Sequence, residues 1–223
     1  MERDETNIAW DAIVNTLGTW RKGLGDPSVT TIAEKYSHDP WAVLSSTILS
    51  LRTKDEVTLR ASAVLLKKAP TPAALLKLDT KMIQDIIFPV GFYRTKALNL
   101  QRIAKIIIEK YKGLVPDDFE ALLELPGVGR KTANLVFIEA FGKEGICVDT
   151  HVHRICNRTG WIETKTPEHT EMRLRAILPR RHWKGLNALL VLYGQQVCRP
   201  INPFCSVCPI KAHCNRNNVI KSH

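Results

Sequence analysis

Residues 125–134, Leu-Pro-Gly-Val-Gly-Arg-Lys-Thr-Ala-Asn, place two glycines just before an arginine and a lysine. Gly127 and Gly129 can adopt positive φ and carry no Cβ, so successive backbone N–H groups could converge on a phosphate oxygen. A helix starting near Arg130 would favour the same anion through its dipole, without reading base sequence. Lys131 would then hold an amine beside a bound phosphate. The alternative is an ordinary turn between two helices with solvated charges.

A second group of candidate residues lies in the last 26 residues, where four of the six cysteines gather. The four are spaced x6, x2 and x5: Cys198, Cys205, Cys208 and Cys214. Four thiolates suit either Zn²⁺ or a [4Fe–4S] cluster, and spacing alone does not separate the two. A disulfide framework is disfavoured because the polar N-terminus lacks the pattern of a secretory signal. Cys147 and Cys156 lie outside this set and should pack as small apolar residues.

The elements that must position these residues are predicted to be helices. Asp39-Pro40, Thr71-Pro72 and Thr166-Pro167 each place a capping side chain before a proline suited to the first helical turn. Apolar residues recur at helical spacing, as in residues 10–17, 41–48, 57–65 and 103–107. Gly113 and Gly142 follow predicted helix ends. The sequence predicts an all-α protein with about ten short helices and no sheet.

The net charge points to a polyanionic partner. The 223 residues include 32 Lys and Arg against 22 Asp and Glu, which gives a formal charge of +10 spread along the chain. Such an excess suits a surface that meets nucleic acid. No apolar run approaches the roughly 20 residues of a membrane span. We therefore expect a cytoplasmic, nucleoid-associated protein without a membrane partner.

Five segments carry a resemblance that extends over nearly the whole chain. They are LSLRTKD (49–55), PVGFYRTKA (89–97), LPGVGRKTAN (125–134), VDTHVHRICNRTGW (148–161) and the four-cysteine tail. In this order they resemble the endonuclease III family of helix-hairpin-helix DNA glycosylases. The resemblance implies two helical lobes flanking a DNA-binding cleft. Residues 29–143 would form a six-helix barrel with the hairpin, and residues 1–28 with 144–223 a lobe carrying a [4Fe–4S] cluster on the four cysteines.

The same resemblance implies roles for two residues at the centre of the chemistry. Lys131 matches the family's nucleophile, an amine that attacks the sugar and forms a Schiff base. Asp149 matches the essential aspartate, which could support the electron-poor transition state and assist proton transfers. Locally, Asp149 also fits the N-cap of a helix, and both roles could hold together.

Further positions are implied to contact DNA. Phe92 matches an apolar wedge and Arg52 a residue that fills the space of an extruded base, although the family usually has Gln at the position of Arg52. The alternative for Phe92 is core packing. Asp55 matches a position near the lesion pocket, or caps a helix. The other implied contacts are Gly127, Val128, Gly129, Arg130, Thr132, His151 and, modestly, Arg199.

Together these features predict a monomeric enzyme acting on duplex DNA with a damaged base or an abasic site. The resemblance implies a bifunctional glycosylase and abasic-site lyase that removes oxidised or ring-saturated pyrimidines and nicks the strand by β-elimination. One rival is a monofunctional mismatch glycosylase of the same fold, which would not need Lys131. The other is a non-catalytic DNA-binding or redox-sensing iron–sulfur protein.

Overall fold

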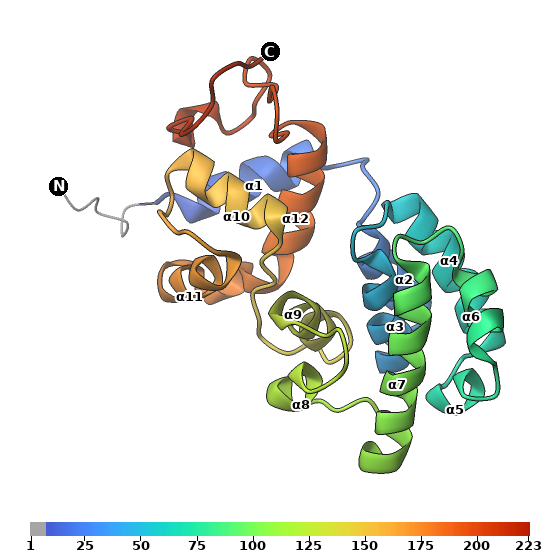
Figure 1. The fold of residues 1–223 in the computed structure, drawn as a ribbon. Coiled ribbons are helices and arrows are strands. Elements are labelled where there is room, and N and C mark those ends of the chain that lie inside the picture. The colour runs from blue at the N-terminus through green and yellow to red at the C-terminus, as the bar shows by residue number, and fades with distance from the viewer. Residues whose placement is uncertain (1–7) are drawn as a thin grey trace. The chain divides into compact units, whose positions relative to one another are not determined.

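A computed structural model describes residues 8–223, which form twelve α-helices and two short 3-10 helices with no strand (Figure 1). The all-helical prediction is therefore confirmed. The chain divides into two compact units, one formed by Pro27–Lys143 and the other by Met1–Asp26 with Glu144–His223. We call them the central unit and the terminal unit. None of the described helices is long and apolar enough to cross a bilayer.

The central unit contains eight helices, of which two are single turns of four and five residues. The eight are α2 (Ser28–Lys35), α3 (Pro40–Ser50), α4 (Asp55–Lys68), α5 (Pro72–Leu75), α6 (Thr80–Ile87), α7 (Tyr93–Tyr111), α8 (Phe119–Leu123) and α9 (Arg130–Glu139). Helix α3 lies at their centre, because every residue from Trp41 to Leu49 is buried. It contacts α2, α4, α7 and α9, and Figure 1 shows the long α7 running beside it.

The helix starts follow the predicted capping chemistry. Asp39 accepts a hydrogen bond from the Ala42 amide at 2.8 Å, and Thr71 accepts one from the Ala74 amide at 3.1 Å. Gly113 and Gly142 have the expected positive φ of 86° and 62°. One position on the predicted apolar faces differs: Val64 is 46% exposed because it lies on the solvent side of α4.

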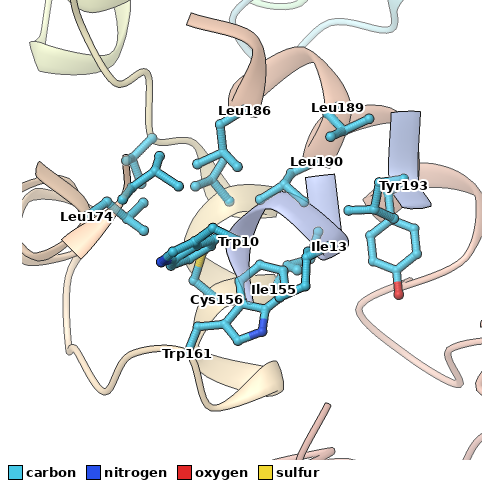
Figure 2. Close-up of a cluster of buried hydrophobic side chains, with 14 of the residues drawn as sticks. Trp10, Ile13, Ile155, Cys156, Trp161, Leu174, Leu186, Leu189, Leu190 and Tyr193 are labelled. Atoms are coloured by element: carbon cyan, nitrogen blue, oxygen red, sulfur yellow. The ribbon is translucent and has the colours of Figure 1, made fainter. Parts of the chain in front are cut away.

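The helices of the terminal unit pack around one buried cluster that contains Trp10, Trp161 and Trp183. Its elements are α1 (Trp10–Trp20), α10 (Thr150–Thr159), α11 (Pro167–Ile177), η2 (Arg180–His182), α12 (Trp183–Gln196) and η3 (Lys211–His213). The Trp10 and Trp161 rings meet edge to face with centroids 5.2 Å apart (Figure 2). Cys156 is buried in this cluster, and burial raises the pKa of its thiol. Cys147 is also fully buried, so both isolated cysteines pack as small apolar residues.

The first boundary between the units lies two residues before the predicted one, between Asp26 and Pro27. Ser28 begins α2, and its Oγ donates to Asp55 Oδ1 at 2.5 Å. This contact fastens the start of α2 to the start of α4. Residues 27 and 28 therefore belong with the central unit.

Candidate functional site

The hairpin between α8 and α9 uses its two glycines differently. Gly127 has φ of +78°, and a Cβ there would lie 2.7 Å from Asn99 Nδ2 on α7. Gly129 is the N-cap of α9 with an extended backbone, φ −96° and ψ 179°. A Cβ at Gly129 would meet no atom within 4 Å. Of the two glycines, Gly127 uses the positive φ that both could adopt, and Gly129 does not, because the residue before a helix takes extended backbone.

Only part of the hairpin is available to a phosphate. Gly127 and Gly129 are exposed, and no described residue accepts a hydrogen bond from the N–H of either. Val128 offers neither its buried side chain nor its N–H, which donates to the Leu125 carbonyl at 3.0 Å. The Thr132 side chain is also buried, which leaves only its backbone in the first turn of α9. The usable donors are therefore the two glycine amides and the N-terminus of α9.

Lys131 is the second residue of α9 and is half-buried. This helix is anchored in the central unit, since Ala133, Leu135 and Val136 are all buried. The neighbouring Arg130 places its guanidinium over the Phe119 ring, 5.2 Å from the centroid. The helix therefore fixes the backbone of Lys131 within one turn of the exposed Gly129 amide.

Asp149 belongs to the terminal unit and is the N-cap of α10. Its Oδ1 accepts hydrogen bonds from the amides of His151 at 2.8 Å and Val152 at 3.0 Å. The predicted capping role is confirmed. Both hydrogen bonds end on Oδ1, so the cap fixes the orientation of the carboxylate and does not use Oδ2.

Arg52 and Phe92 form an exposed pair on the central unit. Both have positive φ, 52° and 56°, although neither is glycine. The Arg52 guanidinium lies 5.6 Å from the centroid of the Phe92 ring. Phe92 is 62% exposed, so the core-packing alternative is wrong. Gly91 permits this approach, because a Cβ there would lie 2.5 Å from the Arg52 carbonyl oxygen.

Sequence reasoning missed a buried lysine beside this pair, Lys96. Its side chain is 6% exposed, and its Nζ donates to the carbonyls of Leu49 and Leu51 and to Thr53 Oγ1. Burial lowers the pKa of Lys96 to about 8. The available signal was its position, because Lys96 falls on the apolar stripe of α7 that continues through Leu100. A lysine on such a stripe requires partners.

The remaining predicted contacts occupy varied surroundings. Asp55 does not cap its own helix, whose N-cap is Lys54; it accepts instead from Ser28 on α2. The His151 ring is half-buried against α12, where a Cβ on Gly194 would lie 2.4 Å from its Nδ1. Arg199 is exposed and stacks over Phe204, 4.7 Å from the ring centroid.

The four C-terminal cysteines form no disulfide, and three of their sulfurs make hydrogen bonds, two of them to nitrogen donors. Arg158 donates to Cys198 Sγ at 3.4 Å, and the Arg216 amide donates to Cys214 Sγ at 3.4 Å. The Tyr193 hydroxyl, which points out of the core in Figure 2, lies 2.9 Å from Cys208 Sγ. Within residues 8–223 no three His, Cys, Asp or Glu side chains converge closely enough to hold a metal ion. Donors directed at sulfur nevertheless suit thiolates, the form that binds metals.

Comparisons with known proteins decide the family. The sequence profile of the HhH-GPD superfamily of base excision DNA repair proteins matches residues 45–180. Endonuclease III of Thermotoga maritima is 49% identical over 176 residues, which are 79% of this chain and 83% of that protein. The chain belongs to the endonuclease III family. Plant endonuclease III homolog 2 of Arabidopsis thaliana is 45% identical over 77% of this chain, which spans only 47% of that protein.

Solved structures agree with membership of the endonuclease III family. A trapped covalent endonuclease III–DNA intermediate has a TM-score of 0.78 and 30% identity, covering 93% of this chain and 96% of that one. A thermostable thymine-DNA glycosylase has a TM-score of 0.83 and 26% identity, covering 96% and 98%. Endonuclease III enzymes are DNA glycosylases with abasic-site lyase activity, and this chain is a DNA repair enzyme of that class.

Proposed function

We propose that this enzyme excises oxidised or ring-saturated pyrimidines from duplex DNA and then nicks the strand 3′ to the abasic site. The observation that carries the proposal is the placement of Lys131 in the first turn of α9, directly after the exposed amides of Gly127 and Gly129. An amine fixed beside a phosphate-binding hairpin can reach the sugar of the nucleotide whose backbone is held there.

Binding begins with the DNA backbone. The amides of Gly127 and Gly129 and the N-terminus of α9 donate to one phosphate, and Arg130 adds positive charge nearby. These contacts set the position of the duplex without reading its sequence. On a protein of net charge +10, they make affinity depend steeply on salt concentration.

The damaged nucleotide must then leave the stack. Phe92 is exposed and apolar, so it can enter the duplex and stack between neighbouring bases. Arg52 beside it can occupy the vacated space and hydrogen-bond the partner base. A ring-saturated pyrimidine stacks poorly, which lowers the cost of its extrusion and makes this substrate class physically sensible.

The chemical steps follow from Lys131 and Asp149. A deprotonated Lys131 amine attacks C1′ of the sugar, and a C–N bond forms as the N-glycosidic bond breaks and the base leaves with a proton. Asp149 stabilises the electron-poor sugar and accepts or returns protons. Ring opening gives a protonated Schiff base that acidifies C2′; loss of a C2′ proton expels the 3′ phosphate, and water releases the enzyme.

We also propose that Cys198, Cys205, Cys208 and Cys214 hold a [4Fe–4S] cluster. The cluster would link the C-terminal loop to α12 as a structural clip, and Arg158 and Tyr193 would contact its ligand sulfurs. Zinc is the rival occupant. Purified protein should absorb visible light as iron–sulfur proteins do; a colourless protein with stoichiometric zinc would overturn the assignment.

A monofunctional glycosylase is the second candidate, since the thymine-DNA glycosylase structure has the higher TM-score of the two described, at 0.83. Such an enzyme uses water and forms no covalent adduct. Borohydride trapping with abasic-site duplex separates the two. We expect an adduct with wild type and with Lys105→Ala, a matched change of an exposed lysine, and none with Lys131→Ala. An adduct that persists in Lys131→Ala would place the nucleophile elsewhere.

The same proposal sets the partner and location. Its partner is double-stranded DNA containing a damaged base or an abasic site, bound by a single copy of the chain. A protein with this substrate works at the nucleoid.

A further inference from the structure

Lys96 is one of two charged side chains that are buried among residues 8–223; the other is Glu171. Glu171 pairs with Arg175 at 3.1 Å, as a buried charge should. Lys96 has no carboxylate partner in this part of the chain. Its ammonium instead donates to three oxygens, which matches its three N–H donors. A buried charge satisfied in this way marks a position where hydrogen bonding matters more than packing.

The three acceptors surround one residue. Lys96 Nζ donates to the Leu49 carbonyl at 2.8 Å, and to the Leu51 carbonyl and Thr53 Oγ1, which lie on either side of Arg52 in sequence. The main chain is therefore fixed immediately before and after Arg52. The 2.8 Å bond crosses 47 residues of sequence, so it joins α7 to the end of α3.

The same hydroxyl connects to the second exposed residue. Thr53 Oγ1 accepts from the Gly91 amide at 3.1 Å, and Gly91 precedes Phe92. Lys96 itself lies one turn after Phe92, and its amide donates to the Phe92 carbonyl at 3.0 Å. The ammonium therefore contacts segment 51–53 directly, and segment 91–93 is joined to it through Thr53 Oγ1 and through the backbone of Lys96. We call Lys96, Thr53 and Gly91 the lysine clamp.

The clamp supports backbone conformations that are costly by themselves. Arg52 and Phe92 both have left-handed φ, and such residues persist only where surrounding structure determines them. The side chains of Arg52 and Phe92 are exposed, so they make few contacts that could fix these backbone conformations. The hydrogen bonds of the clamp supply the missing constraint.

We propose that Lys96 is a positioning residue that holds Arg52 and Phe92 together as one rigid element for opening the duplex. This inference rests on the proposed function of Arg52 and Phe92. Without the ammonium, the carbonyls of Leu49 and Leu51 lose this donor, and only the Gly91–Thr53 hydrogen bond still joins segment 51–53 to segment 91–93. Insertion into DNA then becomes imprecise, while Lys131 on α9 keeps its place. A displacement of about 1 Å in such a positioning element can cost on the order of 100-fold in rate.

The test compares two reactions of each variant. Excision of a ring-saturated pyrimidine from duplex DNA under single-turnover conditions requires opening of the duplex. Borohydride trapping on single-stranded abasic DNA requires only Lys131 and its surroundings. Lys96→Met keeps an unbranched side chain, one atom shorter, and removes the donors. We expect it to slow duplex excision by roughly tenfold or more and to leave single-stranded trapping within about twofold of wild type.

Leu100→Ala is the matched control, because Leu100 lies one turn further along the same stripe and is fully buried. It should lower stability and change the two reactions in the same proportion. If Lys96→Met also changes both reactions equally, or changes neither, the positioning role is overturned. If Lys96→Met does not fold, Thr53→Val provides the test, since it removes the link between Lys96 and Gly91 while keeping side-chain shape.

Arg52→Ala and Phe92→Ala separate this inference from the proposed function. If both excise from duplex at the wild-type rate, the proposed role of the exposed pair is wrong. If they slow excision while Lys96→Met and Thr53→Val do not, the pair acts on DNA and the clamp does not position it. The clamp is supported when all four variants slow duplex excision while Lys96→Met and Thr53→Val retain single-stranded trapping.

Discussion

The guanidinium of Arg52 lies 5.6 Å from the centre of the Phe92 ring, although the two residues are 40 positions apart and both have positive φ. The interaction between a planar cation and an aromatic face contributes about 0.5–1 kcal/mol at an exposed site. The contact is therefore too weak to impose two strained backbones. The backbones of Arg52 and Phe92 are instead held by the hydrogen bonds of Gly91, Thr53 and Lys96.

Phe92→Ala tests whether the exposed ring acts on DNA. Because the side chain is 62% exposed, we expect the free energy of unfolding to change by less than about 0.5 kcal/mol. Excision from duplex should slow by roughly tenfold or more, since an unstacked base is no longer replaced. Met82→Ala, at 53% exposure on α6, is the control and should leave the rate unchanged. Equal rates for the two variants would contradict the wedge role.

The two hairpin glycines should separate stability from DNA binding. Gly127→Ala forces a Cβ onto Asn99 at positive φ, so we expect a loss of about 1–3 kcal/mol in the free energy of unfolding. Gly129→Ala meets no atom of the chain and should cost under about 1 kcal/mol. Its methyl group would instead crowd a bound phosphate and weaken affinity for abasic-site duplex. Urea unfolding and fluorescence anisotropy measure the two quantities; unchanged affinity in Gly129→Ala would argue against the phosphate site.

Two substitutions of Asp149 should distinguish its capping role, which affects stability, from its catalytic role, which affects excision. Asparagine caps helices about as well as aspartate, so Asp149→Asn should unfold within about 0.5 kcal/mol of wild type, whereas Asp149→Ala should lose about 1 kcal/mol. Both should excise bases poorly, because neither carries a carboxylate. Calorimetry and single-turnover excision check the pair of expectations. Full activity in Asp149→Asn would leave Asp149 only as the N-cap of α10.

Lys96 should make stability depend on pH in a defined window. Burial lowers its pKa from 10.5 to about 8, so between these values the unfolded chain binds more protons than the folded one. Unfolding takes up protons there, and stability must rise with pH across the window. We expect the free energy of unfolding of wild type, relative to Lys96→Met, to increase between pH 8 and 10. Urea titrations at matched pH measure the difference; a flat or falling difference would contradict the buried ammonium.

Local chemistry explains what the sequence could predict. The caps at Asp39 and Asp149, the positive φ of Gly127 and the start of α9 at Arg130 depend on neighbours within a few residues. The misses are long-range. Nothing near Asp55 indicated that it would bind Ser28, 27 positions away, instead of capping α4.

The Lys96 clamp was missed for the same reason, with one difference. Its partners lie 43 to 47 positions away, and two of them are backbone carbonyls that sequence does not identify. The lysine itself was visible as a charge on the apolar stripe of α7. Such a residue can be flagged from sequence, but its partners require the fold.

The central claim is that the ε-amino group of Lys131 bonds to the deoxyribose. The most direct measurement is borohydride reduction of the reaction with duplex containing one damaged pyrimidine, followed by proteolysis and mass spectrometry of the DNA-linked peptide. We predict a single adduct on Lys131. Base release without any adduct, or an adduct on another residue, would contradict the account.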